Sequence, residues 1–318
     1  MNKQICVVGN LNIDIIIRNV SSLPMWGREV VGSNHTIVPS GQAGYLCFAL
    51  SKFELGTSVI GNVGNDYYGH MILERLKESK IDIRGVEIVE NGQTCICIAI
   101  CRYDGERAFV SNYASLSDFN SSIIYKHWEL IESSAITCFV GTATFENFPL
   151  DQIKAIAGRV KSTKKSSVLD TGWYSNNFDE KTKNGIKNLL KEISIFLPNM
   201  DEAKAITGYD NPEDASLELQ SYGVDIVVIK NGSKGSLVRS NNKMIHLPAI
   251  STKSLDSVGA GDVYNAGFLY GYVNKYNLET CMAFGSAAAS FYISRSIDRF
   301  PTKQQMMDLA FSYYKDIR

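Results

Sequence analysis

Short apolar runs alternate with helical patterns along most of the chain. The runs are apolar at consecutive positions instead of every second one, which is typical of strands that helices cover on both faces. This pattern predicts an α/β fold with three layers, α/β/α, around a mainly parallel central sheet. The predicted strands are 5–9, 58–63, 134–140, 167–170, 193–197 and 227–230, and the predicted helices are 41–56, 68–79, 150–160, 181–192 and 263–272.

A second group of segments has hairpin character and predicts a small sheet apart from the main core. We expect the four strands to pair antiparallel. Because no composition break or linker separates them from the rest, we predict a single domain over residues 1–318, with a small β-sheet lid contributed by about 13–38 and 93–113. The predicted strands are 13–18, 29–38, 93–102 and 107–113, and Asp104-Gly105 forms the turn between the last two.

Composition excludes several function classes. The 318 residues are 45% hydrophobic, enough for a large core, and a net charge of -1 without a basic stripe argues against a nucleic acid partner. No apolar run is long enough to span a membrane and no signal peptide precedes the first strand, so we expect a cytoplasmic protein without a membrane partner. Cys95, Cys97 and Cys101 alternate within one strand and lack the spacing of a metal site, as expected for reduced cysteines.

The strongest candidate for a catalytic motif is the sequence from Asp256 to Asp262, Asp-Ser-Val-Gly-Ala-Gly-Asp. Gly259, Ala260 and Gly261 would form the opening turn of the buried helix 263–272. Small residues there let an anion approach the backbone N–H groups at the positive end of the helix dipole. Asp262, in the first turn, can accept the proton of a hydroxyl that attacks a phosphate. The alternative is an ordinary glycine turn followed by an aspartate cap, and this motif alone leaves both interpretations open.

Two more polar motifs lie at strand ends. Asn10, Asn12 and Asp14 alternate after the first strand and share one face, which suits a ligand site or a half-exposed strand edge. Asn199 and Glu202 follow the strand 193–197 and bring an amide and a carboxylate to one helix start. Their spacing also matches a helix capping box, so a structural role remains open.

The strand 227–230 runs into a glycine-containing turn that includes Lys230, Gly232 and Gly235. Such a turn can follow a nucleotide closely or can simply be a hairpin to 236–238. The sequence has no P-loop, and no Gly-x-Gly-x-x-Gly follows the first strand, which weakens a dinucleotide-binding interpretation.

Together, these motifs resemble the ribokinase-like carbohydrate kinases, also called the PfkB family, nearly from end to end. The resemblance implies a ribokinase-like fold and transfer of the ATP γ-phosphate to a hydroxyl, usually on a sugar. The matching segments are 7–14, 61–69, 198–202 and 256–262.

The resemblance also implies a role for each matching residue. Asp262 would be the general base, and the N–H groups of Gly259, Ala260 and Gly261 the anion hole. Asn12, Asp14, Gly41 and Tyr45 would bind the sugar. Asn199 and Glu202 would organise the Mg²⁺-phosphate end, with Glu202 meeting the ion indirectly, and Lys230, Gly232, Gly235 and Ser286 would line the nucleotide. Asp256 and Val258, with the backbone near Arg295, would hold a monovalent cation such as potassium.

The sequence departs from the family pattern mainly on the sugar side. Ser40-Gly41 stands where the family has Gly-Gly, and Tyr45 stands where an asparagine usually grips sugar hydroxyls. Ile297 replaces a glycine of the cation loop, which leaves potassium activation open. A nucleoside kinase, with Tyr45 stacked on the base, is one alternative, although a tyrosine at a helix start is also a common packing residue. A sugar- or nucleotide-binding regulatory protein without turnover is another, and a homodimer through the lid is our expectation for assembly.

Overall fold

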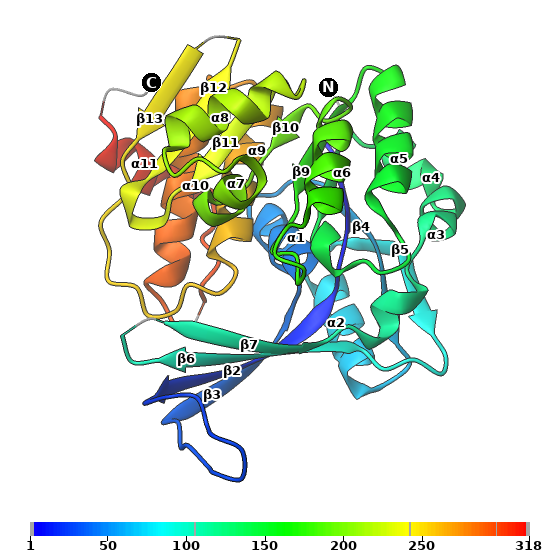
Figure 1. Cartoon of the computed structure of the whole chain (residues 1–318), viewed down its shortest axis with the longest axis vertical. Coiled ribbons are helices and arrows are strands. Elements are labelled where there is room, and N and C mark those ends of the chain that lie inside the picture. The colour runs from blue at the N-terminus through cyan, green and yellow to red at the C-terminus, as the bar shows by residue number, and fades with distance from the viewer. Residues whose placement is uncertain (1–2, 105, 242, 297, 316–318) are drawn as a thin grey trace.

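The computed structural model describes residues 3–104, 106–241, 243–296 and 298–315. Among them, the strands form a nine-stranded sheet and a separate four-stranded sheet (Figure 1). In spatial order, the large sheet consists of β13 (Lys243–Leu247), β12 (Ser236–Ser240), β11 (Ile226–Lys230), β10 (Ile195–Phe196), β9 (Ser166–Asp170), β8 (Ile136–Val140), β1 (Ile5–Gly9), β4 (Thr57–Gly64) and β5 (Asp82–Val89).

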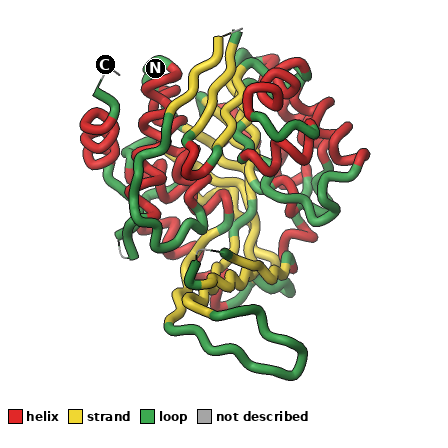
Figure 2. Tube along the Cα trace, turned by 60° about the vertical axis from the view of Figure 1, so that its left-hand side comes forward, coloured by secondary structure: helices red, strands yellow, loops and turns green. Residues whose placement is uncertain are grey.

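Neighbouring strands of the large sheet pair parallel from β5 to β11, and only β12 runs in the opposite direction, pairing antiparallel with both β11 and β13. Helices cover both faces, as the apolar strands predicted (Figure 2). One face packs against α1 (Gln42–Lys52), α2 (Tyr67–Glu78), α9 (Ala260–Val273), α10 (Leu278–Ile293) and α11 (Lys303–Tyr313). The other packs against α3 (Ser121–Lys126), α4 (Trp128–Glu132), α5 (Leu150–Ser162), α6 (Glu180–Leu190), α7 (Met200–Thr207) and α8 (Pro212–Ser221).

Strand β1 shows how the sequence produces the three layers. Ile5 and Val7 belong to one hydrophobic core, whereas Cys6 and Val8 belong to the other. Successive side chains of a strand point to opposite faces, so a continuous apolar run supplies both cores at once. The predicted three-layer α/β/α fold is therefore confirmed. No helix among the described residues is both long and apolar enough to cross a membrane.

The small sheet extends from the lower end of the molecule in Figure 1. Its strand order is β3 (Asn34–Ser40), β2 (Asn12–Val20), β6 (Cys95–Arg102) and β7 (Arg107–Asn112). The prediction of an antiparallel sheet was wrong for its centre, because β2 and β6 are parallel. They follow β1 and β5, which both run to the same edge of the large sheet, so both leave it in the same direction. Gly105, predicted in the turn between β6 and β7, lies outside the described residues.

The prediction of a strand from residue 29 was also wrong, because β3 begins at Asn34. The chain before it forms a long loop with a turn in which the Arg28 N–H donates to the Met25 carbonyl, 2.9 Å away. Gly27, inside this turn, has φ +74°. The loop rejoins β2 only at Ser33, whose N–H donates to the Arg18 carbonyl at 2.9 Å, and Trp26 is fully exposed.

Candidate active site

The polar residues after β1 form a continuous hydrogen-bonded strip. The Asn10 amide donates to Asn12 Oδ1 at 3.0 Å, and the Asn12 amide donates to Asp14 Oδ1 at 2.8 Å and to Ser40 Oγ at 2.9 Å. All four side chains are buried. Burial raises the pKa of Asp14, although its hydrogen bonds counteract part of that shift. The structure thus brings together the predicted pair Asn12 and Asp14.

Gly41 lies beside this strip, at the start of α1. Its φ is +85°, and a Cβ built on it would lie 2.2 Å from the Asn10 carbonyl oxygen. Only glycine fits there, because the backbone of Asn10 cannot move without displacing the strip.

Tyr45, on the first turns of α1, connects the strip to the 256–262 segment. Its hydroxyl donates to Asp14 Oδ2 at 2.7 Å, and a Cβ on Gly259 would lie 2.9 Å from the Tyr45 ring. The ring also packs edge-on against Tyr292 and is only 5% exposed. Burial, together with the Asp14 carboxylate, raises the pKa of Tyr45. Tyr45 is therefore a packing residue, and little of its ring face is accessible for a nucleoside base to stack on.

The 256–262 segment opens α9, as predicted. Gly259 is the helix N-cap with φ +80°, so Asp262 is not the cap but the third residue of the helix. Its carboxylate accepts no hydrogen bond from any described residue. Of the three predicted anion-hole amides, that of Ala260 already donates to the Ser257 carbonyl at 3.2 Å. The remaining first-turn N–H groups have no partner inside the helix, as at any helix start.

Asp262 is buried, at 8% exposure, and faces charges from both sides of the site. Burial raises its pKa well above the usual value, the Asp170 and Asp14 carboxylates add to this increase, and Lys230 opposes it. A carboxylate with a raised pKa holds a proton more strongly and is a better general base near neutral pH.

Lys230, at the end of β11, holds a buried charge network. Its Nζ donates to Asp170 Oδ2 at 2.6 Å and lies 3.3 Å from Asn265 Oδ1, while the Asn265 amide donates to the same Asp170 oxygen at 2.6 Å. The Gln42 amide donates to Asp170 Oδ1 at 3.2 Å. Lys230 Nζ also lies 3.5 Å from where a Cβ on Gly261 would be, so the ammonium adjoins the start of α9. Burial alone would lower the pKa of Lys230, but Asp170 and Glu202 hold it above its usual value.

Sequence reasoning missed Asp170, Asn265 and Gln42 as site residues. A usable signal existed for two of them. Asp170 ends an apolar strand of a parallel sheet, which is the position that also singled out the strip after β1. Asn265 is a buried polar residue in an otherwise apolar helix, and such a residue needs a buried partner.

Asn199 and Glu202 form the capping box that was the structural alternative. The Glu202 N–H donates to Asn199 Oδ1 at 2.8 Å, and the Glu202 carboxylate accepts from the Asn199 backbone N–H at 3.0 Å and from its amide at 2.8 Å. The pair nevertheless adjoins the network, because Asn199 bridges to Lys230 and the Lys230 N–H donates to the Pro198 carbonyl at 2.9 Å. Burial and the Asp170 charge raise the pKa of Glu202 to about 7.

The remaining predicted nucleotide residues lie around the β11–β12 turn and on α10. Gly232 begins the short turn to β12, so β11 and β12 form a hairpin here. Gly235 has φ +92°, and a Cβ on it would lie 2.0 Å from the Leu247 carbonyl oxygen. Ser286 is 2.9 Å from the Tyr314 hydroxyl, which also lies 2.6 Å from the Pro248 carbonyl.

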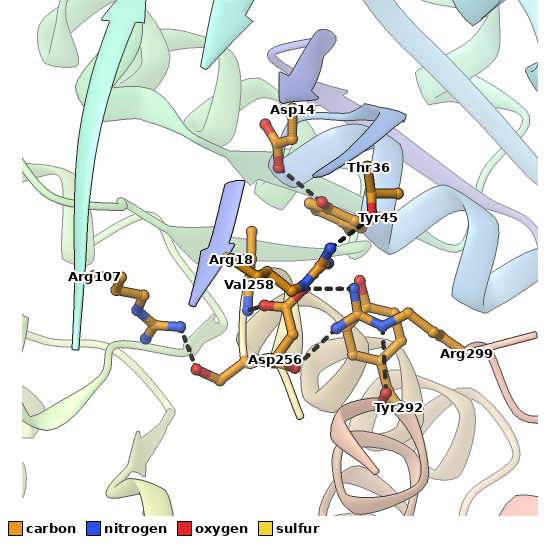
Figure 3. Close-up of polar contacts among 10 residues, drawn as sticks. Asp14, Arg18, Thr36, Tyr45, Arg107, Asp256, Val258, Tyr292 and Arg299 are labelled. Carbon is orange, nitrogen blue, oxygen red and sulfur yellow. Dashed lines mark hydrogen bonds and ion pairs between the residues drawn. The ribbon is translucent and has the colours of Figure 1, made fainter. Parts of the chain in front are cut away.

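Asp256, a predicted cation ligand, is bound by two arginines (Figure 3). Its Oδ2 accepts from Arg18 at 2.7 Å and from Arg299 at 3.0 Å, and its Oδ1 accepts from the Val258 N–H at 2.9 Å. Val258 therefore contributes a hydrogen-bond donor to this turn. Ile297, the departure from the family's cation loop, lies outside the described residues.

Comparison with known proteins gives consistent matches over almost the whole chain. Residues 2–305 match the pfkB family carbohydrate kinase model. A sugar kinase of Archaeoglobus fulgidus, otherwise uncharacterised, is 27% identical over 77% of this chain and 94% of its own length. The ribokinase of Arabidopsis thaliana complexed with ribose and ATP superposes with a TM-score of 0.82 at 23% identity, covering 98% of this chain and 99% of that one. An E. coli protein in complex with ATP and Mg²⁺ superposes with a TM-score of 0.81 at 19% identity, covering 99% and 100%.

Proposed function

Because the chain belongs to the pfkB family of carbohydrate kinases, we propose that it transfers the γ-phosphate of ATP to a hydroxyl of a sugar, with Asp262 as the general base. The observation that carries this proposal is the position of the Asp262 carboxylate. It is buried, free of hydrogen bonds from the described residues, and within electrostatic reach of Asp14 on one side and of Asp170 and Lys230 on the other.

These two sides define two ends of the site. We call Asn12, Asp14, Gly41 and Tyr45 the acceptor end, where the sugar binds. The nucleotide end consists of Asp170, Asn199, Glu202 and Lys230. The turn that contains Gly232 and Gly235 lies beyond it, as does Ser286. Asp262 lies between the ends, where it takes the proton of the sugar hydroxyl as the oxygen attacks the γ-phosphorus in line.

The start of α9 supplies the stabilising charge. A phosphate at this helix start would meet the N–H groups of Gly261 and its neighbours and the positive end of the helix dipole. It would also lie near the Lys230 ammonium. Mg²⁺, when bound with ATP, neutralises phosphate charge. Both Glu202 oxygens already accept hydrogen bonds from Asn199, so this carboxylate would meet the ion through water.

The small sheet acts as a lid over the acceptor end within a single domain. Arg18 and Arg107 connect it to the turn before α9, and closing such a sheet would exclude water from the transferring phosphoryl group. Several apolar side chains of the sheet and its loop are exposed, including Trp26, Ile37 and Val110, which supports a homodimer through the lid. All seven cysteines are free, which supports a reducing compartment such as the cytoplasm.

Release of ADP from Mg-ATP tests this proposal across a panel of pentoses, hexoses, sugar acids, sugar phosphates and nucleosides. We expect one sugar to give turnover, and Asp201→Asn, which removes an exposed carboxylate near the site, to leave it unchanged. Turnover with nucleosides alone would support the nucleoside kinase instead. Binding of Mg-ATP without turnover on any acceptor would favour the regulatory protein and contradict the proposal.

A further inference from the structure

Three arginines from separate parts of the chain meet at the turn that precedes α9 (Figure 3). Arg18 comes from β2, Arg107 from the first position of β7, and Arg299 from the segment between α10 and α11. Arg18 and Arg299 donate to the Asp256 carboxylate, and Arg107 donates to the Ser257 hydroxyl. The turn leads directly into Gly259, so these contacts bear on the geometry of the first turn of α9.

The Arg299 guanidinium donates to a set of oxygens that would also suit a hard cation. Its Nη1 donates to Asp256 Oδ2 at 3.0 Å, its Nη2 to the Asp256 carbonyl at 2.8 Å, and its Nε lies 3.4 Å from the Tyr292 carbonyl. One carboxylate and two backbone carbonyls are ligands that hard cations prefer. The guanidinium also stacks 3.9 Å over the Tyr292 ring, and the Arg299 side chain is only 13% exposed.

The local charge balance disfavours an additional cation. One carboxylate, that of Asp256, faces two guanidinium charges, from Arg18 and Arg299. A potassium ion bound to the same oxygens would meet two like charges at close range, and it would have to displace Arg299 from hydrogen bonds that it already makes. The residues at this turn therefore do not fit a bound monovalent cation.

We propose that the guanidinium of Arg299 replaces the monovalent cation at the Asp256 turn, so that the protein binds Mg-ATP without potassium. Arg299 is a positioning residue: it holds Asp256, which in turn accepts the Val258 N–H at 2.9 Å and fixes the entrance to α9. Arg18 adds a contact from the small sheet to the same carboxylate. The inference rests on the proposed function only in that the turn serves an ATP site.

The wild-type protein provides the first test. Its melting temperature and its Kd for Mg-ATP are measured in potassium chloride and in tetramethylammonium chloride at equal ionic strength. We expect the two Kd values to agree within about twofold, and the melting temperatures within about 1 °C. A saturable, potassium-specific rise in melting temperature or affinity would overturn the inference. The melting temperature needs no ATP, so failure to bind Mg-ATP would count against the proposed function alone.

Substitution of Arg299 provides the second test. We expect Arg299→Ala to weaken Mg-ATP binding by about tenfold in tetramethylammonium, and potassium or guanidinium ions to restore part of it. Lys253→Ala, which removes an exposed cation from the segment before the turn, is the control. A folded Arg299→Ala protein with unchanged binding in both salts would contradict the positioning role. If Arg299→Ala does not fold, Arg299→Lys decides: wild-type affinity in both salts, or an affinity that falls in tetramethylammonium and is restored by potassium, supports the inference, and an affinity that falls equally in both salts opposes it.

Discussion

At the nucleotide end, the residues lie at the ends of strands of the large sheet or at the helix start that follows, whereas the acceptor end combines the small sheet with the start of α1. Asn199 and Glu202 are three residues apart, and β9 and β11 place Asp170 and Lys230 on either side of β10. By contrast, Asn12 and Asp14 belong to β2 of the small sheet, and Gly41 and Tyr45 lie at the start of α1.

This difference has a mechanical consequence. The nucleotide end belongs to the large sheet and the start of α9, so it keeps its geometry wherever the small sheet lies. The acceptor end includes β2 and the loop into α1, and Arg18 and Arg107 connect the small sheet to the turn before α9. We therefore expect substitutions at the nucleotide end to change stability and ATP binding, and substitutions at the acceptor end to change the KM for the sugar.

Lys230→Met should have the largest effect on stability. It removes the only described cation that contacts the Asp170 carboxylate and leaves a charge that is only 3% exposed without compensation. Loss of one partner of a buried ion pair costs about 3 to 5 kcal/mol, so the urea midpoint should fall clearly. Lys234→Met, in the same turn but exposed, is the matched control and should change stability by less than about 0.5 kcal/mol. Equal urea midpoints for the two variants would contradict the stabilising role of Lys230 at the nucleotide end.

Gly41→Ala tests the acceptor end through the backbone. The new Cβ would overlap the Asn10 carbonyl oxygen in addition to the strain of a positive φ, so we expect a loss of about 2 to 3 kcal/mol and a raised sugar KM. Gly208→Ala separates the two causes, because Gly208 has φ +83° with nothing within 4 Å of its Cβ position. It should cost about 1 kcal/mol and leave KM unchanged. A Gly41→Ala protein with wild-type KM would show that the strip does not bind the acceptor.

Tyr45→Phe should have a smaller effect. It removes the hydroxyl that donates to Asp14 and leaves the ring packing in place, so we expect a loss of about 2 kcal/mol in unfolding free energy. The pKa of Asp14 should rise further, because this hydrogen bond lowers it. Tyr67→Phe, at an exposed position, is the control. An unchanged pH dependence of sugar KM in Tyr45→Phe would argue against Asp14 as a sugar ligand.

The pH dependence of stability should show the most gradual effect. The pKa of Glu202 is about 7 when folded and 4.5 as a free side chain, so the folded protein keeps a proton that the unfolded chain has lost. The contribution of Glu202 to stability is therefore greatest below about pH 4.5 and is lost as pH rises through 7, at about 1.4 kcal/mol per pH unit at most. Urea unfolding at several pH values measures this slope, and Glu202→Gln should flatten it. A slope that is identical in both proteins would show that Glu202 does not titrate in this range.

The sequence was sufficient for features that depend on local pattern. Consecutive apolar residues in strands such as 5–9 predicted the covered parallel sheet, and small residues before a buried helix predicted the start of α9. The capping box of Asn199 and Glu202 was equally visible, because its contacts join residues three apart.

Long-range contacts were not accessible in the same way. Nothing near Asp256 in sequence indicates that Arg18 and Arg299 bind its carboxylate, since this depends on how the small sheet and the segment after α10 are packed. The parallel pairing of β2 with β6 depends similarly on the directions of β1 and β5. The departure from the family pattern at Tyr45 was visible in the sequence, but the hydrogen bond of its hydroxyl to Asp14 was not.

The central claim is that Asp262 takes the proton of the acceptor, and turnover and Mg-ATP binding in Asp262→Asn test it most directly. We predict that turnover falls by about 10²- to 10⁴-fold while the Kd for Mg-ATP stays within about threefold of wild type. Burial and its acidic neighbours raise the pKa of Asp262, so the ionised side chain destabilises the folded state and the variant should melt at the same or a higher temperature at pH 8. Near-normal turnover in a folded Asp262→Asn protein would contradict the account.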